Sequence, residues 1–493
     1  MTPGYGLGFR SLDAEVETSL PVEGSLPAWL SGSLVRNGPA LFEVGGRPVA
    51  HWFDGLAMLR RFAFDGGRVD YRNRFLRSGA YRTARDGHLV PGFADVGSGD
   101  SALARFATLL VTAVTDSVDV PLPRVSRCPA RRPADNANVI VERIGGEYVA
   151  LTEAPYRVAV DPETLATLGT VRPNLPRGHL TCAHLHHDRE TGEVVGYDTR
   201  FGHPSRYLVH ATAASGERRL LASLAVRDPS YMHSFALTPN YVVLTEFPLV
   251  VDPLDLLRPD RRDAFIDAYR WEPERGTRVT VLDRRTGGVV ARPVADPLFG
   301  FHHVNAFERG DELVCDLVTF PDPSPVEGMY LDVLRGEAYE APGGALTRLR
   351  IELRARGTPP ISMETRYDGG ITLPRLSPRV RGREHRYVYG QGTHERVTDF
   401  AHEVVKVDAT TGETRRFSRD GWYFGEPVFV PAPRPAAEDE GVALTVALDV
   451  DAGHSWLVVL DGEAFEERAR AALPHAVPFD FHGQFFPELG SGR

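Results

Sequence analysis

The sequence of 493 residues is almost without lysine: Lys406 is the only one, and arginine supplies the other basic side chains. A lysine that forms a Schiff base with a carbonyl substrate is therefore excluded at every other position. Basic residues number 56 against 66 acidic residues, and the formal net charge is −10. This balance argues against general nucleic-acid binding, because such binding needs a basic surface.

Cysteine is scarce as well, since Cys128, Cys182 and Cys315 form neither a Cys-x-x-Cys motif nor a disulfide framework. No apolar run has the length that spans a bilayer. The first residues, Met-Thr-Pro-Gly-Tyr-Gly-Leu-Gly, lack the charged and then apolar layout of a signal peptide. We therefore expect a protein of the reducing cytoplasm.

Short β-branched segments bounded by Gly, Pro, Asn or Asp predict strands along the chain, and long helical periodicity is scarce. One pattern recurs: a strand, an Asp, a polar turn that often holds Thr-Gly, and a second strand. It begins at Val160, His187, Leu282, Val407 and Leu460. Repeated hairpins of this kind over a long all-β chain predict the blades of a β-propeller. A large β-sandwich is the alternative that the pattern leaves open.

Three segments interrupt the strand pattern, near residues 98–125, 252–270 and 324–341. The first contains an apolar, helix-like stretch at 104–114, and the second has the apolar spacing of a helix. No linker or low-complexity stretch divides the chain. We therefore predict one domain over residues 1–493, with these inserts forming a dome over one end of the propeller.

Histidines in four separate local contexts predict a metal site. They are His184 in Thr-Cys-Ala-His-Leu-His-His-Asp, His233 in Tyr-Met-His-Ser-Phe, His302 in Phe-His-His-Val-Asn, and His482 in Phe-Asp-Phe-His-Gly-Gln. Each lies in or beside an apolar or aromatic strand, where an unpaired imidazole is costly to bury. Neutral imidazole is the commonest metal ligand, and several together suit iron, copper, zinc or nickel. A closed fold is needed to bring together residues so far apart in the chain.

Each histidine also fits a satisfied polar residue outside any metal site, and neighbouring residues complicate the choice. Because His302 and His303 are adjacent on a predicted strand, they point to opposite faces and cannot both face one metal. Cys182 is either a further ligand or a small buried strand residue. Glu153 and Glu426 adjoin apolar strand residues, where a carboxylate either accepts the second N–H of a metal-bound imidazole or lies in a turn.

Further motifs accompany the histidine contexts: Arg36-Asn-Gly-Pro39, His51-Trp-Phe-Asp-Gly55, Arg386-Tyr-Val-Tyr-Gly390 and the C-terminal Phe-His-Gly. Together they resemble the carotenoid cleavage oxygenases, over essentially the whole chain from Leu12. The resemblance implies an all-β, seven-bladed propeller with a helical and loop dome. It also implies a non-haem Fe(II) on the propeller axis, bound by four histidines and no carboxylate.

The resemblance also assigns roles to individual residues. Matched position by position, the iron ligands are His184, His233, His302 and His482, with His302 chosen because it directly follows Phe301. Glu153 and Glu426 match carboxylates that orient His233 and His482.

The family usually has a third glutamate, before Phe or Leu, Pro and Arg, which orients the ligand that matches His302. In this chain Thr372 stands at that place, within Ile371-Thr372-Leu373-Pro374-Arg375. A hydroxyl accepts an imidazole N–H but brings no charge. We therefore expect a slightly weaker or more positive iron site.

Motifs at 51–59, 74–78, 135–138 and 151–154 are most similar to the animal-type branch, which includes retinal-forming β-carotene 15,15′-dioxygenases, eccentric cleavers and a retinoid isomerohydrolase. The resemblance implies Fe(II)-dependent cleavage of a carotenoid C=C bond by O₂ into two aldehydes, with central cleavage of β-carotene to retinal as the main expectation. The alternatives are cleavage of an apocarotenoid or at an eccentric bond, retinoid isomerisation or isomerohydrolysis, and a non-catalytic propeller that binds an apolar ligand. A stilbene-cleaving enzyme, which uses a Tyr and a Lys, is disfavoured because Lys406 lies in a predicted outer hairpin.

A carotenoid substrate implies an apolar tunnel beside the metal. Thr152, Phe301 and Phe481 adjoin predicted ligands or Glu153, and they either line this tunnel or pack in the core. Because carotenoids reside in membranes, we also expect peripheral membrane contact. The stretch 104–114 is then either an apolar surface patch at the tunnel mouth or a buried dome helix.

Overall fold

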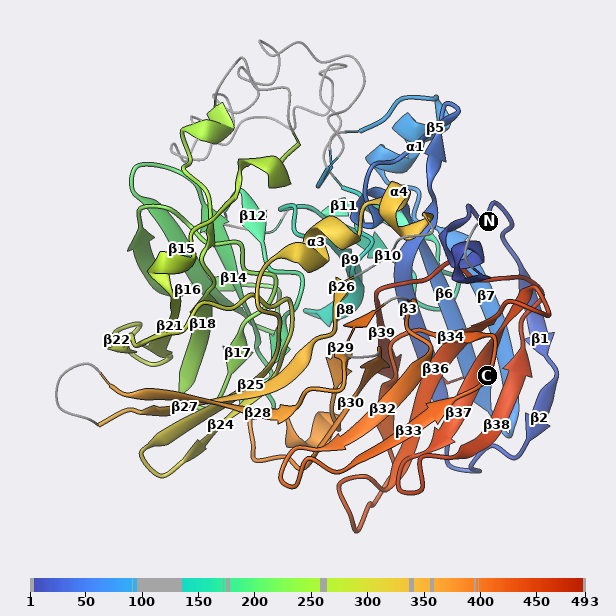
Figure 1. The fold of residues 1–493 in the computed structure, drawn as a ribbon. Helices are drawn as coiled ribbons and strands as arrows, with labels where there is room; N and C mark the ends of the chain where they lie inside the picture. Colours follow the sequence, from blue (N-terminus) through green and yellow to red (C-terminus); the bar gives the residue numbers. More distant parts are fainter. Residues whose placement is uncertain are drawn as a thin grey trace.

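The computed structural model describes residues 4–90, 92–94, 135–171, 173, 178–257, 264–336, 341–354, 359–393, 396–397 and 399–490. The chain is a seven-bladed β-propeller, so the propeller prediction is confirmed and the β-sandwich alternative is wrong. Figure 1 shows the blue N-terminal strands beside the red C-terminal strands. The predicted insert at 98–125, including 104–114, lies outside the described residues.

Each blade is an antiparallel sheet, and the blades are numbered here in chain order. In sheet order, blade 1 holds β1 (Glu17–Leu20), β7 (Arg68–Phe75), β6 (Leu56–Asp65), β3 (Gly32–Leu41) and β39 (His482–Phe486). Blade 2 holds β11 (Thr167–Val171), β10 (Arg157–Val160), β9 (Glu147–Leu151) and β8 (Ile140–Ile144). Blade 3 holds β12 (Leu180–Thr181), β14 (Val194–Arg200), β15 (Ser205–Thr212) and β16 (Arg218–Val226), and β13 (His186–His187) also pairs with β14.

The remaining blades follow the same plan. Blade 4 holds β17 (Ala236–Leu237), β18 (Tyr241–Glu246), β21 (Thr277–Asp283) and β22 (Val289–Ala291), and β23 (Val294–Ala295) also pairs with β21. Blade 5 holds β24 (His303–Arg309), β25 (Glu312–Thr319), β27 (Ala345–Glu352) and β28 (Ile361–Tyr367), and blade 6 holds β29 (Ile371–Arg375), β30 (Tyr387–Gly392), β32 (Glu403–Asp408) and β33 (Thr414–Ser418). Blade 7 holds β2 (Val22–Gly24), β38 (Glu467–Ala472), β37 (His454–Asp461), β36 (Gly441–Asp449) and β34 (Trp422–Phe424), and β35 (Val428–Pro431) also pairs with β36. Short pairs are β4 (Glu43–Val44) with β5 (Arg47–Pro48), β19 (Leu249–Val250) with β20 (Arg270–Trp271), and β26 (Ala341–Pro342) with β31 (Arg396–Val397).

Strands from both ends of the chain close the ring. In blade 1, the C-terminal β39 pairs antiparallel with β3, and Asn37 lies opposite His482. In blade 7, the N-terminal β2 pairs antiparallel with β38. Each end of the chain therefore completes a sheet whose other strands come mainly from the opposite end.

The recurring Asp turn has the same structure at all its positions. Oδ1 of each Asp accepts hydrogen bonds of 2.7–3.4 Å from the backbone N–H groups two and three residues later, at Asp161, Asp188, Asp283, Asp408 and Asp461. The residue four positions after the Asp has a positive φ in every case, which favours glycine and explains the Thr-Gly of the motif. Leu165 and Phe465 occupy this position in two turns, and both side chains are buried in apolar cores.

Short helices gather at one end of the propeller, where Figure 1 shows α1 (Gly79–Arg85), α3 (Ser324–Gly328) and α4 (Leu331–Leu334). The 3₁₀ turns are η1 (Gly4–Phe9), η2 (Trp52–Asp54), η3 (Asp255–Leu257), η4 (Ile266–Ala268), η5 (Pro273–Arg275) and η6 (Pro378–Val380). No helix in the described ranges is long and apolar enough to cross a membrane.

The helix expected over 252–270 is wrong: its described ends form the separate turns η3 and η4. The physical reason is strand pairing, because Arg270 and Trp271 form β20 and pair with Val250 and Leu249 of β19. A paired strand needs extended backbone, so tertiary pairing overrides the local apolar spacing.

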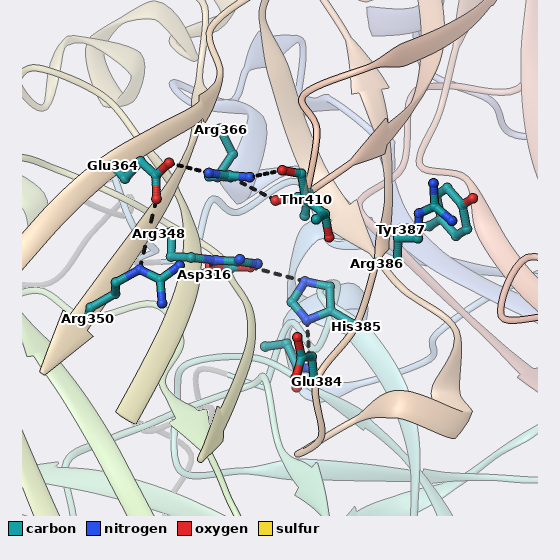
Figure 2. Close-up of polar contacts among 12 residues, drawn as sticks. Asp316, Arg348, Arg350, Glu364, Arg366, Glu384, His385, Arg386, Tyr387 and Thr410 are labelled. Carbon is teal, nitrogen blue, oxygen red and sulfur yellow. Dashed lines mark hydrogen bonds and ion pairs between the residues drawn. The ribbon is translucent and has the colours of Figure 1, made fainter. Parts of the chain in front are cut away.

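A buried polar cluster joins blade 5 to the loop between β29 and β30 of blade 6 (Figure 2). Arg348 of β27 donates Nε and Nη2 to the two carboxylate oxygens of Asp316 of β25, at 2.8 and 2.7 Å. His385, which precedes β30, has Nε2 at 3.1 Å from Asp316 Oδ2 and Nδ1 at 3.1 Å from Asn305 Nδ2. We call Asp316, Arg348 and His385 the Asp316 triad. Both ring nitrogens of its histidine lie 3.1 Å from a protein atom, although Nε2 lacks the geometry of a hydrogen bond to Asp316.

Candidate metal centre and cavity

The fold brings together the four histidines that the sequence singles out. Their ring nitrogens lie within 4.8 Å of one another, in the group His184, His233, His302 and His482, which we call the histidine site. All four lie at the beginning of a strand or beside one: between β12 and β13, before β17, directly before β24, and at the start of β39. Each of these strands lies at or beside one end of its blade's strand order. Four different blades thus each contribute one imidazole.

The spacing of the Nε2 atoms fits a metal ion. His184 Nε2 lies 2.9 Å from His233 Nε2, and His302 Nε2 lies 3.2 Å from His482 Nε2. Metal–imidazole bonds of about 2.1 Å place neighbouring donor atoms about 3 Å apart and opposite donors about 4 Å apart. The contacts and the 4.8 Å limit of the group agree with this expectation.

The charge state of the imidazoles also suits metal binding, which requires the neutral form. Burial, followed by the neighbouring His482, lowers the pKa of His184 and of His302 well below the usual value. Burial likewise lowers the pKa of His482, although Glu426 opposes the shift. These three rings are therefore neutral near pH 7 and offer lone pairs.

Two of the rings are held by carboxylates at the nitrogen that points away from the group. His233 Nδ1 lies 2.7 Å from Glu153 Oε1, and the Tyr231 hydroxyl donates to both oxygens of Glu153 at 3.2 Å. His482 Nδ1 lies 2.7 Å from Glu426 Oε1. A carboxylate that accepts from Nδ1–H fixes the tautomer in which Nε2 is free to bind a metal.

Glu426 is itself tightly held. Arg375 of β29 donates Nε to Glu426 Oε1 at 2.7 Å and Nη2 to Oε2 at 3.1 Å, while the Gly483 backbone N–H donates to Oε2 at 2.8 Å. Burial alone would raise the pKa of Glu426, but Arg375 and His482 outweigh it and lower the pKa to about 2. We call Arg375, Glu426 and His482 the Glu426 triad.

Thr372 lies beside the histidine site, but it does not hold His302. Both residues line the same cavity. Among the described residues, however, no hydrogen bond joins the Thr372 hydroxyl to the His302 ring. The threonine side chain is shorter than the glutamate that the family pattern places there, and no described carboxylate holds His302 as Glu153 and Glu426 hold His233 and His482.

The neighbouring candidates are engaged elsewhere. His303 has Nδ1 at 2.8 Å from Ser234 Oγ and Nε2 at 2.8 Å from Thr245 Oγ1, so both of its nitrogens are occupied. His186 Nε2 lies 2.8 Å from the Phe235 carbonyl oxygen. The Cys182 thiol donates to the carbonyls of His184 and His233, and burial raises its pKa well above the usual value. Cys182 therefore packs under the histidine site rather than joining it.

The histidine site opens on a cavity of about 410 Å³ with mainly apolar walls. The expected tunnel residues Thr152, Phe301 and Phe481 all line it, together with His233, His302 and His482. Helix α1 and the segment after α3 contribute Ala80, Ala84 and Met329, so the helical end of the propeller covers this space. Such a cavity suits a long apolar ligand with few polar groups.

Residue-by-residue reasoning from the sequence missed two contributors to the site, Arg375 and Tyr231. Arg375 appears only as the last residue of the Thr372 motif, and Tyr231 appears two residues before His233 in Tyr-Met-His. Alternation on an extended segment places residues i and i+2 on one face, and this is the signal that points from His233 to Tyr231.

Comparison with known proteins decides the family. The family model described as RPE65, retinal pigment epithelial membrane protein, matches residues 9–487. The carotenoid isomerooxygenase of Galleria mellonella is 31% identical over 513 residues, which cover 98% of this chain and 96% of the relative. The chain belongs to the carotenoid cleavage oxygenase family. The family resemblance and the expectation of a carotenoid cleavage dioxygenase as the class of enzyme are thereby confirmed.

Two other members of the family bear on the site. The human β,β-carotene 15,15′-dioxygenase is 28% identical over 521 residues, covering 95% of this chain and 92% of the relative. A crystal structure of cobalt-substituted Synechocystis apocarotenoid oxygenase (ACO) matches with a TM-score of 0.82 and 25% identity over 98% of both chains. A metal centre is thus present in a solved member of this family of carotenoid oxygenases.

Proposed function

We propose that the histidine site holds Fe(II) and that the protein uses O₂ to cleave one C=C bond of a carotenoid into two aldehydes. The carrying observation is a group of four imidazoles within 4.8 Å that opens on an apolar cavity. Imidazole nitrogens suit iron, whereas calcium would need oxygen ligands. We further propose that residues 1–493 form one domain, in which the inserts near 98–125, 252–270 and 324–341 build the dome.

In this reaction the C=C bond breaks, and each of its two carbon atoms receives one oxygen atom of O₂. Fe(II), when bound, supplies the O₂ chemistry, so no acid, base or nucleophile of the protein is needed. The protein positions the reactants. Glu153 and Glu426 keep the rings of His233 and His482 in one tautomer, and Phe301 and Phe481 hold the polyene next to the histidines. The walls of the cavity exclude water from the aldehyde-forming step.

We propose β-carotene, cut at its central 15,15′ bond, as the substrate. The motifs that resemble the retinal-forming branch support this, as does the relative named β,β-carotene 15,15′-dioxygenase. Cleavage of an apocarotenoid or at an eccentric bond uses the same iron chemistry and differs only in where the polyene stops. Because such substrates dissolve in membranes, we also propose that the protein contacts a membrane peripherally.

The test is aerobic incubation of the Fe(II)-loaded protein with β-carotene in detergent, with products identified by chromatography and mass spectrometry. Retinal as the sole product establishes central cleavage. Unequal aldehyde fragments move the cut to another bond, and cleavage of a shorter apocarotenal alone changes the substrate. A protein that binds iron and turns over none of these polyenes would contradict the proposal.

Isomerisation is the second candidate, and the name of the Galleria mellonella relative, an isomerooxygenase, favours it. Oxygen consumption separates the reactions. Cleavage uses one O₂ per polyene, whereas isomerohydrolysis of a retinoid ester uses none. Measurement of O₂ uptake together with the double-bond geometry of the products shows whether either reaction occurs alone or both occur together.

A further inference from the structure

A second polar region lies near the histidine site but outside the wall of the apolar cavity. Its centre is Arg381, which follows η6 in the loop between β29 and β30. Within the described part of the chain, the Arg381 guanidinium makes no hydrogen bond and no ion pair. The Arg381 nitrogens are not among the side-chain atoms that are both sealed from solvent and without a hydrogen-bond partner. The guanidinium therefore faces space that a water-sized molecule can enter.

The loop that carries Arg381 is held firmly. Asn305, which is 4% exposed, donates Nδ2 to the carbonyl oxygens of Val380 and Arg383 at 3.2 and 2.8 Å. The Gly382 backbone N–H donates to Asn305 Oδ1 at 2.9 Å. One side chain thus clasps the backbone on both sides of Arg381, so the guanidinium is preorganised rather than carried by a loose loop.

The surroundings of Arg381 leave a positive charge uncompensated. Its charged neighbours are Arg375, Arg189, Glu142 and Glu426. Burial, reinforced by Arg375, lowers the pKa of Arg381 even though both glutamates oppose the shift.

Both of those glutamates already have partners. Glu142 Oε2 lies 2.8 Å from His187 Nε2, and Glu426 is held by Arg375 and His482. Arg189 donates Nη1 to the carbonyl oxygens of Pro378 and Arg379 at 3.2 and 2.7 Å, and within the described ranges no ion pair joins it to a carboxylate.

We propose that Arg381 is the core of a binding site for a small oxyanion, such as inorganic phosphate or bicarbonate. A guanidinium offers a planar fork of donors that matches two oxygens of an oxyanion. Arg375 Nη1 has no partner among the described residues and is not an enclosed atom, so it is available as a further donor. This site is distinct from the proposed carotenoid reaction and does not depend on it.

The test is isothermal titration of the metal-free protein with sodium phosphate at constant ionic strength, with thermal unfolding as a second readout. The expected result is saturable binding to one site and a rise in the unfolding midpoint, because a ligand that binds only the folded state stabilises it. Bicarbonate is expected to compete with phosphate, whereas chloride at the same ionic strength is not.

Three variants assign the binding to Arg381. Arg381→Gln is expected to weaken phosphate binding at least about tenfold, and Arg381→Lys less, because lysine keeps the charge but loses the fork. Arg285→Gln is the matched control, since it removes one exposed arginine from the hairpin between β21 and β22 of blade 4 and should leave binding unchanged.

Far-ultraviolet circular dichroism checks that each variant is folded, and the lysine variant keeps the test valid if the glutamine variant is unstable. Absence of saturable phosphate and bicarbonate binding would overturn the proposal. Phosphate binding of equal strength in the wild type, Arg381→Gln and Arg381→Lys would overturn it too, as would a site selective for chloride.

Discussion

The Glu426 triad and the Asp316 triad contain the same three chemical groups: a carboxylate, a bidentate arginine and a histidine. In both, the carboxylate is fully buried and the guanidinium donates Nε and Nη2 to it. The difference is the second ring nitrogen. Nδ1 of His385 faces the Asn305 amide, whereas Nε2 of His482 faces His302 across the histidine site. Burial and a nearby carboxylate are common to both histidines. His482 is a candidate metal ligand because its second ring nitrogen faces the histidine site, whereas the second ring nitrogen of His385 faces an amide and the residue has a structural role.

The largest effect is expected from the two histidines. His482→Ala removes a proposed ligand, so iron affinity should fall by more than about 100-fold, beyond the loss typical of an outer partner, and carotenoid cleavage should cease. His385→Ala should leave iron binding intact and lower the stability of the fold. Metal titration with product analysis checks both variants. The comparison breaks if His385→Ala loses iron while His482→Ala keeps it.

Arg348→Met tests the structural side. It leaves the carboxylate of Asp316 buried without its main partner, so the free energy of unfolding should fall by about 3–5 kcal/mol. Iron affinity should not change, because Asp316 does not touch the histidine site. Urea unfolding followed by tryptophan fluorescence measures the first quantity, and metal titration measures the second. A variant that is as stable as the wild type contradicts the expected role.

Glu426→Gln tests the metal side with a smaller change. The neutral amide holds His482 less firmly in the tautomer that frees Nε2, so iron affinity should fall about 10–100-fold. Asp316→Asn is the matched control, since it removes a buried carboxylate of the same kind and should leave iron affinity unchanged. Equal losses of iron in both variants would show that the effect is general destabilisation.

Thr372→Glu is expected to have the smallest effect. A carboxylate at this position is expected to reach the His302 ring across the cavity that both residues line, so iron affinity should rise by up to about tenfold, the lower end of the range for an outer partner. Thr372→Val should match the wild type, because no hydrogen bond joins the Thr372 hydroxyl to His302 among the described residues. Identical iron loading of the wild type and Thr372→Glu would refute this account of the site.

Much of the site was predictable because its chemistry is written in local sequence. His184, His233, His302 and His482 stand out as imidazoles in apolar strands, and the family resemblance pairs Glu153 and Glu426 with two of them. The Asp turns were equally visible, since one side chain and one left-handed residue define them within five positions.

Other features depend on contacts that no local pattern carries. Arg375 meets Glu426 from 51 positions away, and Arg348 meets Asp316 from 32 positions away. The register between strands and between blades sets both contacts. In the segment 252–270 the local pattern is misleading, because its apolar spacing predicts a helix whereas Arg270 pairs with β19 as part of β20. Thr372 is a third case. The family pattern places it beside His302, but the length of its side chain decides whether the hydroxyl contacts the His302 ring.

The pairing of Asn37 with His482 couples ring closure to assembly of the histidine site. The strand that seals blade 1 begins with the last of the four imidazoles, so an unsealed ring lacks a complete set of donors. During synthesis, the histidine site therefore becomes complete only after β39 has been made and has paired with β3. The time at which pulse-labelled protein takes up iron would then report the time at which β39 pairs with β3. Incomplete propellers would carry no reactive metal.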